Sequence, residues 1–546
     1  MRIIIIGAVA AGTSAAAKAR RNSEDAEIVV YGKESLISYA GCGMPYFIGG
    51  EVEDAEELFP RKPEFFKSKY NVDIFTSHEV LSINPNKKTV EVKNLSTGEV
   101  FTDLYDKLVI ATGARAAVPP IKGKDGVNIF TLRNIGDMNK IKNYIDEKHP
   151  KSAAIVGTGF IGLEVCENFK KLGIEVTMIE KLPQVTPGLD SDMAVHVKEH
   201  IERNGITVLT GASINEFTED SVILEDGKVI GADIILLSTG VRPNTEIASA
   251  VGIELGVAGA IKVDKKMQTN LKDIYACGDC IEEYHVVTGK PVYRPLGSTA
   301  NKTGRIAGEN ITGGNLEFRG ILGTGIFKIF EMTVAQTGLS EHEAKGQGYD
   351  VVVCHNIKFN KPDYMGGKEM IIKAIADKSN GRLIGAQIVG YEGVDKRIDV
   401  FATAITFKAK AEDLFHLDLA YAPPFSIAKD PVMYTGMILD NALNKDRILI
   451  TTQELDELIS SGKKYTLVDA REASEYEKSN IVSAENIPLA KLRTAADGMD
   501  KEALTVAYCK RGVTSNAAQN ILINKGIKNV LNLSGGYTQY SKAHLE

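Results

Sequence analysis

Short apolar runs separated by glycine-containing turns and helical stretches recur along the chain. Residues 3–6 and 27–31 are apolar, strand-like runs on either side of a stretch with helical spacing, and residues 153–156 and 175–180 repeat the same order. A buried parallel strand, a tight turn, a helix and a second strand produce this pattern. The sequence therefore predicts two βαβ units and an α/β fold.

Later segments have a different pattern. Residues 105–114 and 270–279 each end a strand-like run in small residues. Residues 324–330 and 350–354 are also strand-like, and residues 398–408 have helical spacing. The last three segments predict an α+β domain.

A junction of polar turn residues at 441–446 separates that domain from a further one. After it, the pattern predicts a helix at 453–460, strands at 465–471 and 504–509, and a loop at 510–515 that leads into another helix. Strands that alternate with helices predict another α/β domain.

Composition and charge narrow the class of protein. The chain has 546 residues, 44% hydrophobic and 25% charged, with a formal charge of -7, which predicts several domains and provides no basic field for nucleic acid. Six cysteines are too sparse for a disulfide scaffold and suit a reducing compartment. No apolar run approaches the ~20 residues of a membrane span, and His and Cys never cluster at metal-ligand spacing. We therefore expect a cytoplasmic protein without a metal site.

The second βαβ unit carries a dinucleotide fingerprint. Gly157, Gly159 and Gly162 have the spacing that permits a sharp turn, close approach to a pyrophosphate and tight helix–strand packing. The N-terminus of the helix then favours the phosphates. The next strand ends at Glu180, where a carboxylate accepts hydrogen bonds from a ribose 2'-hydroxyl and repels a 2'-phosphate. NADH is therefore expected in preference to NADPH.

The first βαβ unit is a weaker match, because Gly7 and Gly12 flank a turn that lacks the middle glycine. Two later strands support it, one ending at Gly113 and the other at Gly278 and Asp279. Small-residue turns let the chain pass close to an extended cofactor, and Asp279 is placed to bind a ribityl hydroxyl.

Two tandem nucleotide units, an Ala-Thr-Gly-Ala turn between them and a Gly-Asp strand end after them resemble the pyridine nucleotide-disulfide oxidoreductase superfamily. The resemblance implies that the first unit binds FAD and the second binds NADH. The cofactor-binding residues that it implies are Gly7, Val9, Ala10, Gly12, Thr112, Gly113, Gly157, Gly159, Phe160, Ile161, Gly162, Glu164, Glu180, Gly240, Gly278 and Asp279.

Within this superfamily, the sequence Ser-Tyr-Ala-Gly-Cys-Gly-Met-Pro-Tyr at 38–46 and Tyr-Ala-Pro-Pro-Phe at 421–425 resemble coenzyme A disulfide reductases. The added C-terminal domain resembles reductase–rhodanese fusions known as NADH-dependent persulfide reductases. The resemblance implies two Rossmann-like nucleotide-binding domains, an α+β domain that forms a homodimer, and a rhodanese-like α/β domain. The expected boundaries are 1–115 with 241–319 for FAD, 116–240 for NADH, 320–441 for the dimer and 447–546 for the rhodanese-like domain.

Cys42 is the candidate nucleophile of the reductase. It lies in a loop with Gly41, Gly43 and Pro45, and no second cysteine follows it closely enough to form an internal disulfide. A single thiolate beside a flavin can instead attack a substrate disulfide or persulfide and retain a mixed disulfide. We expect the helix that starts near Gly12 and the flavin to lower the pKa of Cys42.

The resemblance also implies substrate contacts. Tyr364 and Tyr421 of the partner subunit would donate a proton to the leaving thiolate, because a phenol keeps its proton at neutral pH. Coenzyme A carries several phosphates, which require cations. The implied substrate-binding residues are Ser14, Lys18, Arg21, Ser38, Arg61, Asn301 and Lys429. Gly41 stands where the family usually has Asn, so a side-chain hydrogen bond beside the nucleophile is lost.

Cys509 is the candidate sulfur carrier of the C-terminal domain. It ends a strand and begins the loop 510–515 before a helix, where backbone N–H groups stabilise a thiolate or persulfide, and Lys510 and Arg511 add positive charge. The Asp469-Ala-Arg471 and Asn486-Ile-Pro488 motifs around it resemble rhodanese, and Asp469 and Arg471 are expected to form a structural pair.

Three functions are compatible with these residues. The preferred one is an NADH- and FAD-dependent reductase of coenzyme A disulfide, coenzyme A persulfide or polysulfide through Cys42. An NADH oxidase that uses a sulfenate of Cys42 to reduce oxygen is the second. A non-enzymatic redox or sulfide sensor is the third. A redox role for Cys277 and Cys280, which have Cys-x-x-Cys spacing, is a minor alternative because they lie in the flavin-binding strand end.

Overall fold

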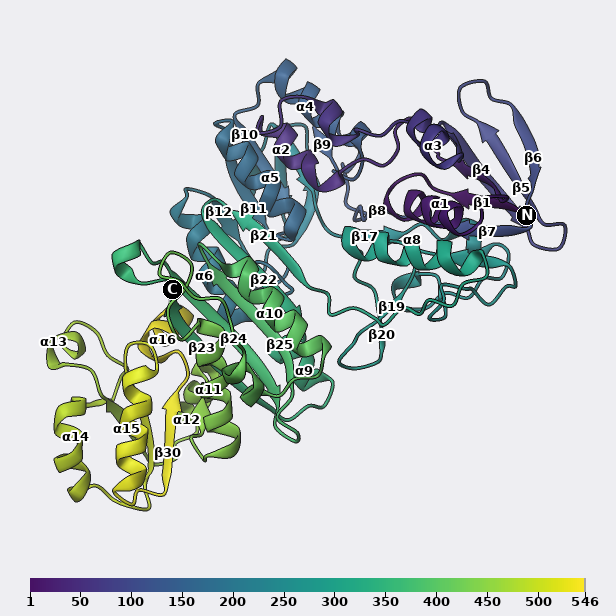
Figure 1. Cartoon of the computed structure of the whole chain (residues 1–546). Helices are drawn as coiled ribbons and strands as arrows, with labels where there is room; N and C mark the ends of the chain where they lie inside the picture. The colour runs from purple at the N-terminus through teal and green to yellow at the C-terminus, as the bar shows by residue number, and fades with distance from the viewer. Residues whose placement is uncertain (545–546) are drawn as a thin grey trace. The chain divides into compact units, whose positions relative to one another are not determined.

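The computed structural model describes residues 1–544, which form two compact units (Figure 1). The first comprises residues 1–183 and 206–323, and the second comprises residues 184–205 and 324 onwards. The expected rhodanese-like range, 447–546, ends in two residues that lie outside the described part.

The first unit contains two five-stranded parallel sheets. One has the order β18 (Ile274–Ala276), β7 (Lys107–Ile110), β1 (Arg2–Ile6), β2 (Glu27–Tyr31) and β3 (Asp73–Phe75). The other has the order β12 (Thr207–Leu209), β11 (Glu175–Ile179), β10 (Ser152–Val156), β16 (Ile234–Leu237) and β9 (Ile129–Phe130). The apolar runs are buried in these central strands, as parallel sheets covered on both faces require. The two predicted βαβ units are confirmed.

Helices and small sheets complete this unit. The helices are α1 (Ala10–Asn22), α2 (Met44–Ile48), α3 (Pro63–Tyr70), α4 (Ile135–Lys148), α5 (Phe160–Lys171), α7 (Glu246–Ser249) and α8 (Gly297–Ile311). One three-stranded antiparallel sheet consists of β4 (His78–Asn84), β5 (Thr89–Asn94) and β6 (Val100–Leu104). Another consists of β13 (Ile214–Phe217), β14 (Ser221–Leu224) and β15 (Val229–Gly231).

Helices α1 and α8 approach each other closely because α8 carries glycines at their contact. A Cβ on Gly304 would overlap the carbonyl oxygen of Ala11, and a Cβ on Gly308 would overlap that of Ala15. This close packing joins the first βαβ unit to a helix nearly 300 positions further along the chain.

The second unit contains a five-stranded antiparallel sheet. Its order is β21 (Gly325–Ile329), β22 (Met332–Gly338), β25 (Leu383–Gly390), β24 (Glu369–Asp377) and β23 (Val351–Phe359). The strand predicted at 350–354 therefore continues to Phe359. The associated helices are α6 (Ser191–Arg203), α9 (Glu341–Gly346), α10 (Val394–Thr406) and α11 (Pro431–Asn444).

The C-terminal part of the second unit is a separate parallel sheet. Its order is β26 (Leu449–Ile450), β30 (Asn529–Leu533), β29 (Leu504–Tyr508), β27 (Tyr465–Asp469) and β28 (Glu485–Asn486). Its helices are α12 (Thr452–Ser460), α13 (Ala473–Tyr476), α14 (Leu489–Ala495), α15 (Val513–Asn524) and α16 (Gly536–Ala543) (Figure 1). The predicted α/β character of this domain is confirmed.

Candidate functional site

Cys42 lies in a short 3-10 turn, Gly41–Gly43, directly before α2. Pro45 occupies the beginning of α2, where a missing N–H costs no helical hydrogen bond. The Cys42 thiol is free and exposed. The loop therefore presents the sulfur for chemistry, as predicted from the small residues around it.

The protein's own groups raise the pKa of the Cys42 thiol. Desolvation has the largest effect and the Glu164 carboxylate adds to it, whereas the Arg133 guanidinium lowers the pKa and Asp279 raises it. The expected lowering of this pKa by the helix near Gly12 is not among these effects, and its lowering by the flavin stays a prediction. Two carboxylates and desolvation outweigh the single guanidinium.

Among the charged groups, Glu164 has the largest effect on the pKa of this thiol, and its own pKa is raised. Burial raises the pKa of Glu164 to about 7, the hydrogen bond from Tyr46 lowers it, and Glu167 raises it. It lies near the beginning of α5, a helix that packs on the α2 segment that follows Cys42. A carboxyl that exchanges its proton near neutral pH beside a nucleophile suits acid–base chemistry.

Glycines of the second βαβ turn and of the turn after β7 have two roles: some permit a close approach of the backbone, and others leave open space. A Cβ on Gly157 would lie 2.6 Å from the carbonyl oxygen of Ser238, so the φ of 99° at Gly157 and this close approach both require glycine. By contrast, a Cβ on Gly159 or Gly113 would meet no atom of the described residues within 4 Å. The turns therefore border open space at the N-terminus of α5 and at the end of β7, which fits an extended dinucleotide.

Two predicted cofactor carboxylates already have protein partners. Glu180, which is 7% exposed, accepts hydrogen bonds from the backbone N–H (3.0 Å) and hydroxyl (2.7 Å) of Thr158 and from the N–H of Leu182 (3.0 Å). Asp279 forms an ion pair of 2.6 Å with Arg133. Glu180 thus fixes the glycine-rich turn, and its contact with a ribose stays a prediction, as does the ribityl contact of Asp279.

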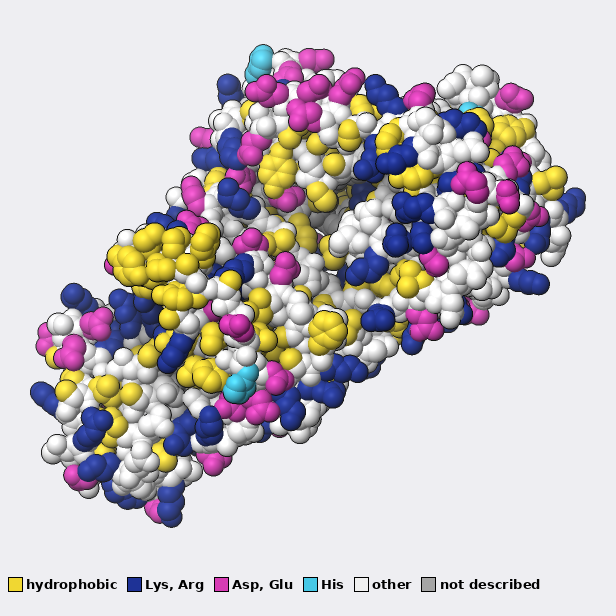
Figure 2. Space-filling view, viewed as in Figure 1, with side chains coloured by type: hydrophobic (Ala, Val, Ile, Leu, Met, Phe, Trp, Pro, Cys, Tyr) yellow, Lys and Arg dark blue, Asp and Glu magenta, His cyan; other side chains and the backbone are white. Residues whose placement is uncertain are grey.

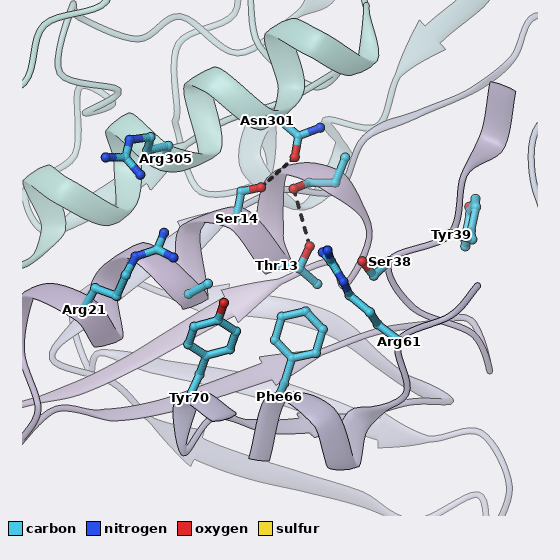
Figure 3. A pocket seen from close by; sticks show the side chains of 12 residues that line it. Thr13, Ser14, Arg21, Ser38, Tyr39, Arg61, Phe66, Tyr70, Asn301 and Arg305 are labelled. Carbon is cyan, nitrogen blue, oxygen red and sulfur yellow. Dashed lines mark hydrogen bonds between the residues drawn. The ribbon is translucent and has the colours of Figure 1, made fainter. Parts of the chain in front are cut away.

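Five of the seven predicted substrate residues line one cavity of about 480 Å³ in the first unit (Figure 3). Its twelve lining residues are Ala10, Thr13, Ser14, Ala17, Arg21, Ser38, Tyr39, Arg61, Phe66, Tyr70, Asn301 and Arg305. The Ser14 hydroxyl donates a hydrogen bond of 2.8 Å to the side-chain oxygen of Asn301. Ser38 and Tyr39 shortly precede Cys42, so the cavity adjoins the cysteine segment.

The cavity combines positive charge with aromatic rings. Three arginines line it, no acidic residue is among its described lining, and the Phe66 and Tyr70 rings form part of its wall (Figure 3). Figure 2 shows Lys and Arg side chains gathered over α1 and α8 in this unit. The guanidinium carbon of Arg21 lies 5.9 Å from the ring centre of Tyr70. Such a lining suits a ligand that carries both phosphates and a ring.

Sequence reasoning missed three useful members of this cavity: Arg305, Phe66 and Tyr70. Arg305 stands one helical turn after Asn301 on α8, so the spacing of those two residues was an available signal. The two predicted residues outside the lining are Lys18, which pairs with Glu309 at 2.6 Å, and Lys429, which belongs to the second unit.

Tyr364 and Tyr421 lie in exposed turns of the second unit. Tyr364 is in the 3-10 turn Asp363–Met365, and Tyr421 follows the turn Ala411–His416. Their side chains are 76% and 52% exposed, respectively. Their action on a substrate stays a prediction.

Cys509 is enclosed by the loop between β29 and α15. Its side chain is 3% exposed, and the Ser515 hydroxyl contacts its sulfur at 3.4 Å. The two loop cations both have carboxylate neighbours: the Lys510 ammonium lies 3.9 Å from Glu475, and the Arg511 guanidinium lies 2.6 Å from Glu369. Their expected charge at the sulfur is therefore partly offset, and stabilisation of the sulfur by backbone N–H groups of the loop stays a prediction.

The remaining candidates behave as structural groups. Cys277 and Cys280 are buried and free, and burial raises the pKa of Cys280 to about 11. Asp469 and Arg471 form the expected buried pair, with contacts of 2.6 and 3.0 Å. Among residues 1–544, no group of three or more His, Cys, Asp or Glu is arranged to hold a metal, and no helix is long and apolar enough to cross a membrane.

Residues 1–300 match the family "Pyridine nucleotide-disulphide oxidoreductase", and this range covers both βαβ units and ten of the twelve residues that line the cavity. The chain belongs to this family. It is therefore an oxidoreductase, and FAD and NAD(P)H are the cofactors of its family. Residues 325–431 match the dimerisation domain of the same family, and residues 451–543 match a rhodanese-like domain.

Two solved structures resemble this oxidoreductase over almost its whole length. The reduced Bacillus anthracis CoADR-RHD is 38% identical, with a TM-score of 0.97, and the match covers 99% of this chain and 98% of that one. A NAD-dependent persulfide reductase from A. fulgidus is 36% identical, with a TM-score of 0.91, over 99% of this chain and all of the other.

Curated relatives match about four fifths of this chain. A NADH oxidase of Methanocaldococcus jannaschii is 37% identical over 82% of this chain and 99% of its own length. A coenzyme A disulfide reductase of Staphylococcus haemolyticus is 35% identical over 80% of this chain and 98% of its own length.

Proposed function

We propose that this oxidoreductase uses NADH to reduce coenzyme A disulfide, coenzyme A persulfide or polysulfide through Cys42, and that Cys509 carries sulfane sulfur. The cavity beside the Cys42 segment carries most of the argument. Its three arginines match a ligand with several phosphates, its rings match an adenine, and Ser14 and Asn301 offer polar groups between them. Coenzyme A has this combination of groups and ends in a thiol.

Cys42 supplies the nucleophile. Its thiolate attacks one sulfur of coenzyme A disulfide, a Cys42–coenzyme A disulfide forms, and the second coenzyme A leaves as a thiolate. With coenzyme A persulfide, attack on the inner sulfur gives the same mixed disulfide and releases hydrosulfide. FAD, when bound, supplies the two electrons from NADH that cleave the mixed disulfide and return Cys42 and coenzyme A as thiols. The six cysteines are all free, and none is paired with Cys42.

Acid–base groups of the chain handle the protons. Glu164, with its pKa of about 7, has the largest charge effect on Cys42 and accepts or returns a proton as the thiol ionises. In the proposed homodimer, the exposed phenols of Tyr364 and Tyr421 protonate the leaving thiolate from the other subunit. The match to a dimerisation domain supports this assembly.

Cofactor contacts follow from the two βαβ units. The turn from Gly7 to Gly12, together with Gly113 and Asp279, would hold FAD, and the turn from Gly157 to Gly162 would hold NADH. A cytoplasmic location fits the free thiols, because a reducing compartment keeps such cysteines unpaired.

A NADH oxidase is the second candidate, and the relative from Methanocaldococcus jannaschii favours it. The reductase and the oxidase can both use the flavin and the lone cysteine. The feature that distinguishes them is therefore the cavity. Reduction of oxygen requires no cavity for phosphates and a ring, whereas binding of coenzyme A does, so the cationic cavity favours the coenzyme A substrates.

Steady-state NADH oxidation tests the choice. The wild-type protein should oxidise NADH at a higher kcat/KM with coenzyme A persulfide or disulfide than with air-saturated buffer alone. The Cys42→Ser protein should lose only the sulfur-dependent rate. NADH consumption that depends on oxygen and does not respond to any coenzyme A substrate would contradict the proposal.

A further inference from the structure

A row of polar side chains, three of them buried, crosses the antiparallel sheet of the second unit. His355 on β23 faces Lys373 on β24, Lys373 faces Gln387 on β25, and Gln387 faces Gln336 on β22. His355 is 3% exposed, and Lys373 and Gln387 are each 1% exposed. Polar groups in a sheet interior cost free energy unless they are hydrogen-bonded, so this row calls for partners.

Helix α6, the residues before it and the first residue of α9 supply those partners. The Lys373 ammonium lies 2.8 Å from both oxygens of Asp192 and 3.2 Å from Asp190. It also lies 2.7 Å from Glu341. Gln387 donates to Asp190 at 2.7 Å and accepts from its backbone N–H at 3.0 Å. The carboxylates raise the pKa of Lys373, and Lys373 holds the pKa of Asp192 well below its usual range although burial opposes this.

His355 links this row to the rhodanese-like domain. Its Nε2 lies 2.8 Å from Asp192, its Nδ1 lies 3.0 Å from the hydroxyl oxygen of Ser534, and its backbone N–H donates to the same oxygen at 2.6 Å. If the Ser534 hydroxyl donates to Nδ1, the ring proton is on Nε2 and is donated to Asp192. This arrangement gives both ring nitrogens of His355 a hydrogen-bond partner.

Ser534 begins a segment that supports the Cys509 loop. A Cβ on Gly536 would lie 2.9 Å from the nitrogen of Gly512 and 3.0 Å from that of Arg511. The N–H of Tyr537 donates to the carbonyl oxygen of Cys509 at 2.8 Å, and that of Thr538 donates to Lys510 at 2.9 Å. The backbone of 534–538 therefore sets the position of the loop that follows Cys509, and we expect the N–H groups of that loop to stabilise the sulfur.

Further contacts join the rhodanese-like domain to the same helix without touching Ser534. His196 of α6 lies 3.0 Å from Gln539, and Glu199 of α6 pairs with Lys542 at 2.5 Å. Both partners belong to α16, which packs on α6 (Figure 1). These contacts provide an internal comparison, because they hold the domain and include neither Ser534 nor any residue of the Cys509 loop.

We propose that His355 is a positioning residue for Cys509: held by Asp192 and Lys373, it fixes Ser534 and thereby the loop that activates the sulfur. The dimerisation domain thus sets the reactivity of the rhodanese-like domain. The proposal rests on the proposed function only in assigning sulfane sulfur to Cys509. When sulfur is transferred to Cys509, its thiolate bonds to the outer sulfur of a persulfide. The bond between that sulfur and the donor breaks, and the donor leaves as a thiolate.

Two readouts in the otherwise intact chain carrying Cys42→Ser test the proposal. The first is the rate at which iodoacetamide alkylates Cys509, followed by peptide mass spectrometry. The second is the kcat and KM for persulfide formation on Cys509 from a low-molecular-weight persulfide. His355→Phe should lower the alkylation rate and kcat by about tenfold and leave KM nearly unchanged. His355→Asn, which keeps a polar group near Ser534, should recover part of the loss.

Ser534→Ala serves as a second variant, and its effect should not add to that of His355→Phe, since both act through one contact. The control is His196→Phe, which removes a docking contact on the same helix and should react at the wild-type rate. Equal rates for the wild type and His355→Phe, or equal losses for the His355 and His196 variants, would overturn the proposal. If Cys509 takes no sulfane sulfur but its alkylation depends on His355, the positioning role stands and the proposed sulfur carriage fails.

Discussion

The Ser14 hydroxyl lies 2.8 Å from the side-chain oxygen of Asn301, although 287 positions separate the two residues. The contact joins α1 to α8 at the wall of the cationic cavity, and the glycines of α8 make the approach close enough. Coenzyme A recognition would therefore depend on residues from both ends of the first unit.

Removal of cavity arginines should weaken coenzyme A binding. Arg21→Ala or Arg305→Ala is expected to raise the KM for coenzyme A disulfide by about 10- to 100-fold with little change in kcat, since each deletes a charge-assisted hydrogen bond. Steady-state kinetics measures this. Arg319→Ala, an exposed residue of the same unit that does not line the cavity, is the control. An unchanged KM in both cavity variants would exclude the cavity as the binding site.

Neutralising Glu164 should make Cys42 more reactive at lower pH. The Glu164 carboxylate raises the pKa of Cys42, so Glu164→Gln removes a negative charge that disfavours the thiolate. The midpoint of Cys42 alkylation against pH is therefore expected to move downward. A shift upward, or none, would show that this carboxylate does not control the thiol.

Glu164 also predicts a pH dependence of stability. Burial raises the folded-state pKa of Glu164 from its ordinary value of 4.5 to about 7, so the folded protein binds more protons than the unfolded chain between these values. The contribution of this raised pKa to the free energy of unfolding is fully present below pH 4.5 and is lost as the pH rises through about 7. Compared with the wild type, Glu164→Gln should lose less thermal stability between pH 5 and 8. Parallel melting curves for both proteins would refute this assignment.

Glu180 should select the dinucleotide and support its loop. Glu180→Ala removes three hydrogen bonds at the turn and the charge that opposes a 2'-phosphate. We expect the wild type to prefer NADH, and the variant to lose most of this preference and to have a higher KM for NADH. The ratio of kcat/KM for the two nucleotides measures the effect, and a variant with the wild-type ratio would assign selectivity elsewhere.

The buried pair of the rhodanese-like domain should be sensitive to loss of one partner. Asp469 is 0% exposed, so Asp469→Asn leaves the Arg471 guanidinium without its charged partner and should cost about 3–5 kcal/mol in denaturant unfolding. The control is Glu502→Gln, which breaks an exposed pair with Lys528 and should change stability by about 1 kcal/mol or less. Similar losses in both variants would contradict the structural role of Asp469.

The sequence was most informative about features that depend on residues close together in the chain. Strands such as Glu27–Tyr31 follow from apolar runs, and Gly157 follows from the turn that only glycine allows. Cys42 was identifiable from the small residues of its loop. Its raised pKa was not, because Glu164 and Asp279 reach the thiol from distant segments.

Features that depend on tertiary contacts were harder to predict. Phe66 and Tyr70 belong to no motif, and only the fold brings them to Arg21. Residues 184–205 lie within the range expected for NADH binding, but α6 belongs to the compact unit of the dimerisation sheet. The contact between His355 and Ser534 has no local signal, since it joins two separate domains. The domain boundaries stay predictions.

The central claim is that Cys42 holds a sulfur-bound fragment of the substrate during turnover. The wild-type protein, mixed with coenzyme A persulfide without NADH and then digested without reductant, should yield the Cys42 peptide with the added mass of coenzyme A, and NADH should remove that mass. A Cys42 peptide that stays free of coenzyme A, and that gains oxygen instead in air, would contradict the account.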